Sequence, residues 1–342
     1  MGMDFKRKLP IPKEIKEQYP IPKNSEIIKK NRDEEIVNIF NGKSCKFLLI
    51  IGPCSADRQD SVLEYLERLK YISEEVSDKI FIIPRVFTNK PRTSGKGYMG
   101  MLHQPDPQGS TDLLKGLIAI RLLHLKALVD YGFTCADELL YPENFRYLSD
   151  MLSYVTVGAR SVDNQFHRLV ASGLDIPVGM KNPVSGNIDV MINAINSARA
   201  SHAFLYRGWE VVTSGNELSH AVLRGYVNQE GINVPNYKFD DLCNITYQLN
   251  EQCEKMVPII VDTNHSNSNK EYEQQIEIAL DVLKSKRKNP ELDSSIKGLM
   301  IESYLEDGRQ DVSIAKYGTS ITDPCLGWNK TEQLIYCIAD KL

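Results

Sequence analysis

The sequence lacks the features of a membrane, secreted or nucleic-acid-binding protein. No apolar run reaches the roughly 18 residues that a membrane-spanning helix needs, and the opening stretch MGMDFKRKLPIPKE has no apolar core that could act as a signal peptide. The formal net charge of −4 argues against a general polyanion binder. Neither a nucleic acid nor a membrane is therefore an expected partner, and any anion site must be a local basic pocket.

Cysteine is scarce, and its spacing contains no CxxC pair. An odd total of seven cysteines favours reduced thiols over a disulfide framework. The cytoplasm is the expected location. No linker or break in composition divides the chain, and its 42% hydrophobic and 25% charged residues are typical of a globular protein with an ample core.

Eight apolar runs of strand length alternate with segments of helix length. Within each run the apolar residues are continuous rather than alternating, which indicates strands that are buried on both faces, as in a parallel sheet. The runs cover residues 47–55, 79–86, 133–140, 155–161, 177–183, 203–207, 258–266 and 298–305. Eight such strands predict an α/β fold, a (β/α)₈ TIM barrel over residues 47–342, with its active site at the carboxyl ends of the strands.

Charged or metal-binding side chains follow most of these runs, so we expect one rim of the barrel to carry the chemistry. The side chains at the ends of the runs are Cys54, Arg85, Glu138, Arg160, Lys181, His265 and Glu302. Two connections, residues 87–109 and 208–237, are unusually long. Loops of that length on a barrel rim usually have a function.

The first 46 residues precede the barrel and contain the tetrapeptide PIPK twice, at 10–13 and 20–23. The prolines predict an extended arm, followed by a helix near residues 26–41. Apolar residues within this N-terminal extension suggest that it docks on another surface, such as a neighbouring subunit. The clearest helix of the barrel is expected at residues 110–131, with Ser110 as its cap and Gly132 at its end.

The densest basic segment is RVFTNKPRTSGKG, residues 85–97, which contains Arg85, Lys90, Arg92 and Lys96. Guanidinium groups bind phosphate or carboxylate oxygens through paired hydrogen bonds, and lysine adds a point charge. The segment directly follows a predicted buried strand, which favours an anion-binding loop. The alternative is a solvated basic loop, which is the usual meaning of a run of charges.

Three further cations, Arg160, Lys181 and Arg224, lie at or beyond the ends of other strands. Each alone could be a side chain that reaches solvent or forms a salt bridge. On one rim, together with Arg85 and Lys90, they indicate a pocket for a small ligand with several negative charges. Two cations about 4 Å apart repel each other by roughly 4 kcal/mol at an effective dielectric constant of about 20, so such clustering is costly without an anion.

A possible metal site comprises Cys54, His265, Glu302 and Asp323, which follow the first, seventh and eighth strands. Closure of a barrel makes those three strands neighbours. A thiolate, an imidazole and two carboxylates suit Mn²⁺, Fe²⁺, Co²⁺ or Zn²⁺ without selecting among them. The alternative is that Cys54 is a small buried apolar residue and His265 an ordinary loop histidine. Cys325, close after Asp323, is expected near Cys54.

Ten motifs in order give the sequence a specific family resemblance. They are IGPCS (51–55), RVFTNKPRT (85–93), GAR (158–160), VDNQFHRLVASGL (162–174), PVGMKN (177–182), TSGN (213–216), LRG (223–225), DTNHSNSNK (262–270), MIES (300–303) and YGTSITDPCLGW (317–328). The chain resembles type I 3-deoxy-D-arabino-heptulosonate 7-phosphate (DAHP) synthases from about residue 47 to 342. Its N-terminal arm is similar to that of the feedback-regulated bacterial members. The resemblance implies condensation of phosphoenolpyruvate with erythrose 4-phosphate, the first step of the shikimate pathway to aromatic amino acids.

The resemblance also implies a function for each polar side chain at the rim. The implied metal ligands are Cys54, His265, Glu302 and Asp323, and Asp323 would also lie beside the substrate. The implied substrate contacts are Arg85, Lys90 and Lys181 around the phosphoenolpyruvate carboxylate, Arg160 and Arg224 on its phosphate, Arg92 and Thr93 on the erythrose 4-phosphate group, and Glu138 near phosphoenolpyruvate. Arg85 and Lys90 would be catalytic. We expect the metal to polarise the aldehyde and Lys90, with a pKa lowered by its cationic neighbours, to deliver a proton.

The segment YRGWEVV, residues 206–212, looks shorter than the stretch that helps to form the inhibitor pocket in well-known regulated members. An aromatic amino acid is therefore a possible inhibitor of unknown identity, and a homo-oligomer, either a dimer or a tetramer, is expected. One alternative function is 3-deoxy-D-manno-octulosonate 8-phosphate synthase, whose family has a KANRS-like stretch where this chain has KPRT. The other is a non-catalytic sensor of phosphosugars or aromatic metabolites, which loss of a metal ligand or of Lys90 would have favoured.

Overall fold

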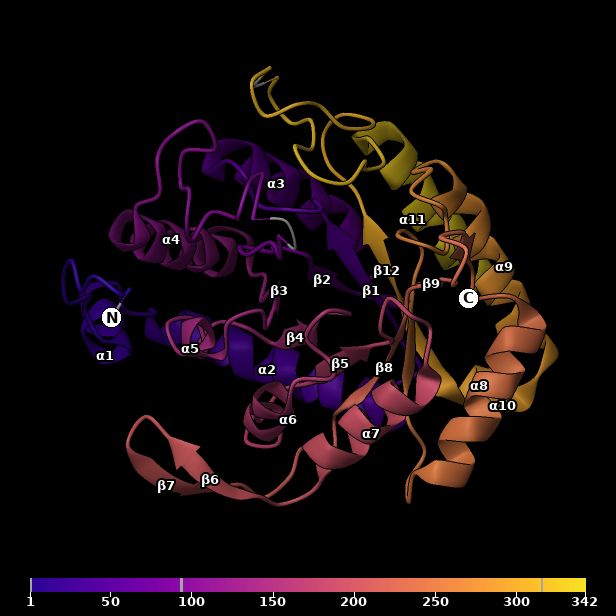
Figure 1. Ribbon diagram of the computed structural model, residues 1–342. Helices are drawn as coiled ribbons and strands as arrows, with labels where there is room; N and C mark the ends of the chain where they lie inside the picture. Colours follow the sequence, from indigo (N-terminus) through magenta and orange to yellow (C-terminus); the bar gives the residue numbers. More distant parts are fainter. Residues whose placement is uncertain (1, 93–94, 315) are drawn as a thin grey trace.

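A computed structural model describes residues 2–92, 95–314 and 316–342 of the chain. Eight parallel strands form its central sheet, in the order β2-β1-β12-β11-β8-β5-β4-β3 (Figure 1). They are β1 (Phe47–Gly52), β2 (Ile80–Pro84), β3 (Ala136–Glu138), β4 (Tyr154–Val157), β5 (Val178–Lys181), β8 (His220–Leu223), β11 (Ile259–Asp262) and β12 (Ile296–Glu302). A parallel bridge between Arg85 and Ala136 joins β2 to β3, the two ends of this order. The sheet is therefore closed, and the predicted (β/α)₈ barrel is confirmed.

Helices surround the barrel and bury their apolar sides against the strands. The longer ones are α3 (Gln59–Glu75), α4 (Leu113–Tyr131), α6 (Gln165–Ala171), α7 (Ile188–Arg199), α8 (Phe239–Gln252), α9 (Gln274–Lys288) and α11 (Trp328–Lys341), and α5 (Pro142–Phe145) and α10 (Pro290–Ser295) are short. The cap of α4 is Asp112 rather than the expected Ser110, because the Asp112 carboxylate accepts the backbone N–H of Lys115. The helix ends as predicted at Gly132, whose φ of 72° places it in the left-handed region.

The sixth barrel strand was assigned wrongly from the sequence. The apolar run at residues 203–207 forms β6 (Ala203–Tyr206), which pairs antiparallel with β7 (Trp209–Val212) in a hairpin that projects from the barrel (Figure 1). Leu205 is 76% exposed and Val212 is 71% exposed. The sixth barrel strand is the buried β8 (His220–Leu223), which lies inside the connection expected at 208–237. A second small pair, β9 (Tyr226–Val227) and β10 (Asn233–Val234), follows it.

The N-terminal extension docks on the barrel of its own chain. It contains α1 (Pro12–Gln18) and α2 (Lys23–Phe40), and Ile36, Ile39 and Phe40 of α2 are buried in one cluster with the side chains inside the barrel. The ring of Phe40 lies 4.6 Å from that of His220, the first residue of β8. Helix α2 therefore closes the end of the barrel opposite the predicted active site. No helix among the described residues is long and apolar enough to cross a membrane.

Candidate active site

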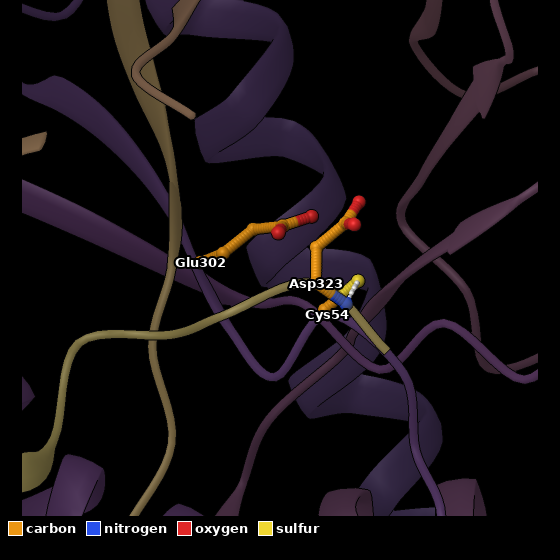
Figure 2. Close-up of side chains that lie close together, drawn as sticks. All are labelled: Cys54, Glu302 and Asp323. Carbon is orange, nitrogen blue, oxygen red and sulfur yellow. Dashed lines mark hydrogen bonds between the residues drawn. The ribbon is translucent and has the colours of Figure 1, made fainter. Parts of the chain in front are cut away.

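Three of the four predicted metal ligands form a compact cluster at the carboxyl ends of the strands. Ligand atoms of Cys54, Glu302 and Asp323 lie within 4.8 Å of one another, with the two carboxylates directed toward each other and the Cys54 sulfur beside the Asp323 backbone nitrogen (Figure 2). Because β1 and β12 pair with Gly52 opposite Glu302, the chain just after β1 lies beside the end of β12. The backbone N–H of Asp323 donates to the Cys54 sulfur at 3.4 Å, which ties the segment before α11 to the same place.

His265, the fourth predicted ligand, lies beside this cluster. It follows β11 and has a φ of 54°, which is rare for a residue with a side chain. Its Nδ1 lies 2.9 Å from the Asp262 carboxylate, whereas its Nε2 lies 3.8 Å from Oε1 of Glu302. Burial lowers the pKa of His265 more than the Asp262 carboxylate raises it. A neutral ring that donates through Nδ1 keeps the Nε2 lone pair available for a metal.

Glu302 is buried and held by two side chains. The Arg85 guanidinium donates to its Oε1 at 2.7 Å, and the Asn264 amide donates to its Oε2 at 2.6 Å. Burial opposes ionisation of Glu302, but nearby positive charges, above all that of Arg85, outweigh that effect and lower the pKa of the carboxyl. Arg85 also donates to the backbone oxygens of Pro53 and Cys54, so it holds the chain that carries Cys54 next to Glu302.

Lys90 lies at the cluster, but its electrostatics differ from the expectation. Its ammonium group donates to the Cys54 sulfur at 3.2 Å. Burial and Arg85 favour the neutral amine, yet the negative charges of a Cys54 thiolate, Glu302 and Glu138 outweigh them and raise the pKa of Lys90. Burial also raises the pKa of the Cys54 thiol, so at neutral pH the carboxylates of Glu302 and Glu138 are the anions that act on Lys90. The predicted lowering of the Lys90 pKa is therefore wrong, because the sequence displays the neighbouring cations but not the anions that the fold brings to the same point.

The remaining cations differ in how they are engaged. Buried Lys181 pairs with Asp262 at 3.0 Å. Arg224 is also buried, and its Nη1 has no hydrogen-bond partner among the described residues. Burial lowers the pKa of Arg224, and the positive charge of Arg160 contributes to that lowering, so the two guanidinium groups are near enough to repel each other. Arg160 itself is exposed. A buried donor without a partner beside a second cation is an arrangement suited to an anion.

The remaining residues predicted at the site are Arg92, Thr93, Glu138 and Cys325. Arg92 is half-buried and donates to the backbone oxygen of Tyr98 at 2.7 Å. Thr93 lies outside the described residues. Glu138 ends β3 and lies against Gly158, where a methyl group would collide with the Glu138 carboxylate. Cys325 lies beside Cys54 as expected, with its sulfur 3.4 Å from the Cys54 backbone nitrogen.

The sequence reasoning missed the residues that orient this site. Asp262 binds both His265 and Lys181, and Asn264 binds Glu302. Both belong to the motif DTNHS, in which only the histidine was singled out. Their position at the end of a predicted strand was a signal available for finding them, but which partner each would bind depends on the register of β11 beside β12.

These features define a (β/α)₈-barrel enzyme whose rim combines a soft and hard donor set with buried cations. A sequence model of the family described as "DAHP synthetase I family" matches residues 15–335. The chain belongs to this family.

Named relatives and a solved structure agree with that assignment. The phospho-2-dehydro-3-deoxyheptonate aldolase of Haemophilus influenzae is 36% identical, in an alignment that covers 95% of this chain and 89% of the relative. The Tyr-sensitive enzyme of that name from Escherichia coli is 35% identical, with 95% of this chain and 90% of the relative covered. The structure of the Francisella tularensis aldolase has a TM-score of 0.91 at 29% identity and covers 100% of this chain and 98% of that one.

Proposed function

We propose that the rim of this barrel condenses phosphoenolpyruvate with erythrose 4-phosphate and water, giving DAHP and inorganic phosphate. This is the reaction of DAHP synthases, the family to which the chain belongs, and it is the first step of the shikimate pathway. The proposal depends above all on one observation, the cluster of Cys54, Glu302 and Asp323 with the Lys90 ammonium on the Cys54 sulfur. The family match favours this reaction over the octulosonate synthase, and no contact among the described residues of the site favours a non-catalytic sensor.

The four predicted ligands form a donor set that fits a divalent metal ion. Three ligand atoms lie within 4.8 Å of one another, and the free Nε2 of His265 faces the same carboxylate. The combination suits Mn²⁺, Fe²⁺, Co²⁺ or Zn²⁺. When bound, such an ion would supply Lewis-acid polarisation of the aldehyde oxygen.

The cations of the rim divide between the two ends of phosphoenolpyruvate. The unpartnered Nη1 of Arg224, with exposed Arg160 beside it, is suited to the phosphate group. We assign Lys181 and Lys90 to the carboxylate, as the family resemblance implies. Arg85 donates to Glu302, Pro53 and Cys54, so its main contribution is to hold Glu302 and to add positive charge. Arg92, and Thr93 by the family motif, would bind the phosphate of erythrose 4-phosphate.

The condensation joins C3 of phosphoenolpyruvate to the aldehyde carbon. The aldehyde oxygen gains a proton to become a hydroxyl, and water adds at C2 before the C2–O bond to phosphate breaks. We assign proton delivery to Lys90, because its raised pKa keeps the ammonium charged at neutral pH. The negative charge of Glu138 acts on both Lys90 and Arg85, and we assign to this carboxylate the binding of the attacking water.

The test of this function is a phosphate-release assay with both substrates, with and without EDTA. Lys90→Met should lose about 100- to 10,000-fold in kcat, the usual contribution of a general acid. Lys96→Met is the matched control, since Lys96 is an exposed lysine of the same loop. Phosphate release that needs no erythrose 4-phosphate, or a Lys90→Met variant with near-native kcat, would contradict the proposal.

A cavity beside the β6–β7 hairpin supports feedback inhibition by an aromatic amino acid, as the name of the Tyr-sensitive relative indicates for that protein. The cavity has a volume of about 820 Å³ and lies among α1, the segment after α5, the end of α6 and the hairpin. Phe145, Phe204 and Tyr206 offer aromatic surface, and Lys16 and Arg146 offer positive charge for a carboxylate.

Titration calorimetry with phenylalanine, tyrosine and tryptophan tests this regulatory site. Arg146→Leu should weaken binding of the active amino acid by about tenfold to a hundredfold, the cost of losing a hydrogen bond to a charged group. Arg287→Leu, on the exposed side of α9, should leave binding unchanged. Equal binding by both variants would rule out this cavity, and no binding by wild type would rule out aromatic feedback.

We also propose that the protein assembles with copies of itself. The exposed apolar residues of the hairpin and of the arm, among them Met3 and Phe5, support a homo-oligomer, either a dimer or a tetramer, and light scattering of the purified protein would distinguish these states. All seven cysteines are free thiols, which is consistent with the cytoplasmic location expected from the sequence.

A further inference from the structure

Two buried amide groups behind the active site lack hydrogen-bond partners in the described part of the chain. They are Oδ1 of Asn89, in the loop after β2, and Nδ2 of Asn144, in α5. The other end of the Asn89 amide is engaged, because its Nδ2 donates to Oγ1 of Thr88 at 3.3 Å. Buried polar atoms in native proteins are almost always paired, with protein or with ordered water. An acceptor and a donor are therefore both left without a partner.

Both residues line the same enclosed cavity. Its volume is about 10 Å³, which is room for a single water molecule. Asp137 and Glu138 belong to the same lining. A water here can donate one hydrogen to Asn89, accept the Asn144 amide and donate its second hydrogen to a carboxylate, so it would have the two to four polar partners that a buried water needs.

We propose that one buried water joins Asn89 to Asn144, and that Asn144 is thereby a positioning residue for Lys90. This inference rests on the proposed function of Lys90 in proton delivery. Asn89 directly precedes Lys90, whose backbone N–H donates to Met99 and whose ammonium reaches the Cys54 sulfur. A displacement of the Asn89 side chain therefore changes where the ammonium group lies.

With the proposed water in place, hydrogen bonds would run without a break from β3 through Thr88 and Asn89 to Asn144 in α5. The Asp137 carboxylate accepts the Thr88 backbone N–H at 2.8 Å and the Glu138 backbone N–H at 2.7 Å. Thr88 in turn accepts the Asn89 amide. On one side Asn89 is therefore fixed through Thr88 to β3, and only its Oδ1 depends on the water and on α5.

The matched substitutions are Asn144→Leu, Asn144→Ser and Asn196→Leu. Leucine removes the donor and fills the cavity, whereas serine keeps a hydroxyl and leaves room for water. Asn196 is a half-buried helix asparagine in α7, whose Nδ2 donates to the Gln252 backbone oxygen in a different cavity. It controls for the loss of one asparagine hydrogen bond without a change near Lys90.

A crystal structure of the wild type should show one ordered water within hydrogen-bond distance of Asn89 Oδ1 and Asn144 Nδ2, and Asn144→Leu should lack it. Asn144→Leu should lose about tenfold to a hundredfold in kcat, as expected for a misplaced catalytic group, with little change in KM. Asn144→Ser and Asn196→Leu should keep wild-type kcat.

Three results would overturn the inference: an empty cavity in the wild type, protein partners for both amide atoms, or wild-type kcat in Asn144→Leu. Should Asn144→Leu fail to fold, the crystallographic water and the activity of Asn144→Ser still decide. Loss of the Lys90 function itself is measured separately by Lys90→Met, so a failure of this inference and a failure of the proposed function give different results.

Discussion

Glu302 is the residue at which the contacts of the active site meet. Its carboxylate accepts hydrogen bonds from Arg85 and Asn264. It also lies near Nε2 of His265 and belongs to the cluster with Cys54 and Asp323. Removing one partner of a buried ion pair generally costs about 3–5 kcal/mol, because the remaining charge stays buried without compensation. Arg85 and Glu302 therefore constrain each other, and neither can be exchanged without consequences for the fold as well as for the reaction.

The stability of the protein should depend on pH through one buried carboxyl group, that of Asp137. Burial raises its pKa from the usual 3.8 to about 7, in spite of hydrogen bonds from Thr88 and Glu138. The group facing it from α4 is His124, whose pKa burial lowers to about 3, so the imidazole adds no charge.

The folded protein therefore holds a proton on Asp137 that the unfolded chain has already released. Between about pH 4 and pH 7 the free energy of unfolding should fall with rising pH by about 1.4 kcal/mol per unit from this group. Asp137→Asn removes that contribution. Urea unfolding of both proteins at several pH values in this window should give a stability difference that changes with pH, and a constant difference would contradict the assignment.

Side-chain identity predicted which residues gather at the site but not their partners. Cys54 and Glu302 are metal-binding side chains at the ends of neighbouring strands, so barrel closure was enough to bring them together. Asp323 lies beyond β12, and its backbone N–H holds it at the Cys54 sulfur. Asp262 and Asn264 escaped notice because their contacts depend on strand register. The sign of the Lys90 pKa shift was wrong for the same reason, since a pKa follows from all neighbouring charges and not from the nearest ones in sequence.

Helix α4 and the loop that carries Lys90 are in contact at a glycine. Gly116 lies inside α4, and a methyl group there would collide with the carbonyl group of Leu102. Leu102 belongs to the connection after β2, and its N–H donates to the backbone oxygen of Thr88. The close approach of helix and loop thus fixes the segment just before Lys90.

Gly116→Ala should therefore destabilise the protein, although alanine normally favours a helix. The helix preference contributes about 1 kcal/mol, whereas overpacking costs typically about 1–3 kcal/mol, so a net loss of up to about 2 kcal/mol is expected, together with reduced kcat. Lys115→Ala, one residue earlier and largely exposed, is the control. Thermal unfolding and the phosphate-release assay measure both effects. A Gly116→Ala variant that is more stable and fully active would show that the loop moves aside without loss of stability or activity.

The hairpin β6–β7 shows where continuous hydrophobicity misleads. The residues of β6 alternate between exposed and half-buried, but every position of β6 is apolar or aromatic, so the period that marks a one-sided strand is hidden. The true sixth strand, β8, has four residues like β6, but it begins with a histidine. Composition therefore favoured the wrong segment, and only pairing with β5 and β11 identifies the right one.

Packing divides the N-terminal extension into two parts, because α2 belongs to the barrel core and α1 does not. Ile36, Ile39 and Phe40 of α2 share a buried cluster with residues of the barrel interior, such as Leu48 and Ile50. Helix α1 instead lies on the outside, where Tyr147 donates to the Pro10 backbone oxygen and the adjoining arm is held by Arg121 at Tyr19. The predicted regulatory extension therefore contains one helix that completes the fold and one that borders the proposed inhibitor cavity.

Two truncations separate these functions. A chain that begins at residue 23 keeps α2, so it should fold and retain kcat but lose inhibition by the aromatic amino acid. A chain that begins at residue 47 also loses the three buried apolar side chains of α2, each contributing about 1.5–3 kcal/mol, against a total stability of about 5–15 kcal/mol for a typical domain. It should be largely unfolded by circular dichroism. Full activity of the shorter chain would show that the barrel does not need α2, and unchanged inhibition of the longer one would remove α1 from the regulatory site.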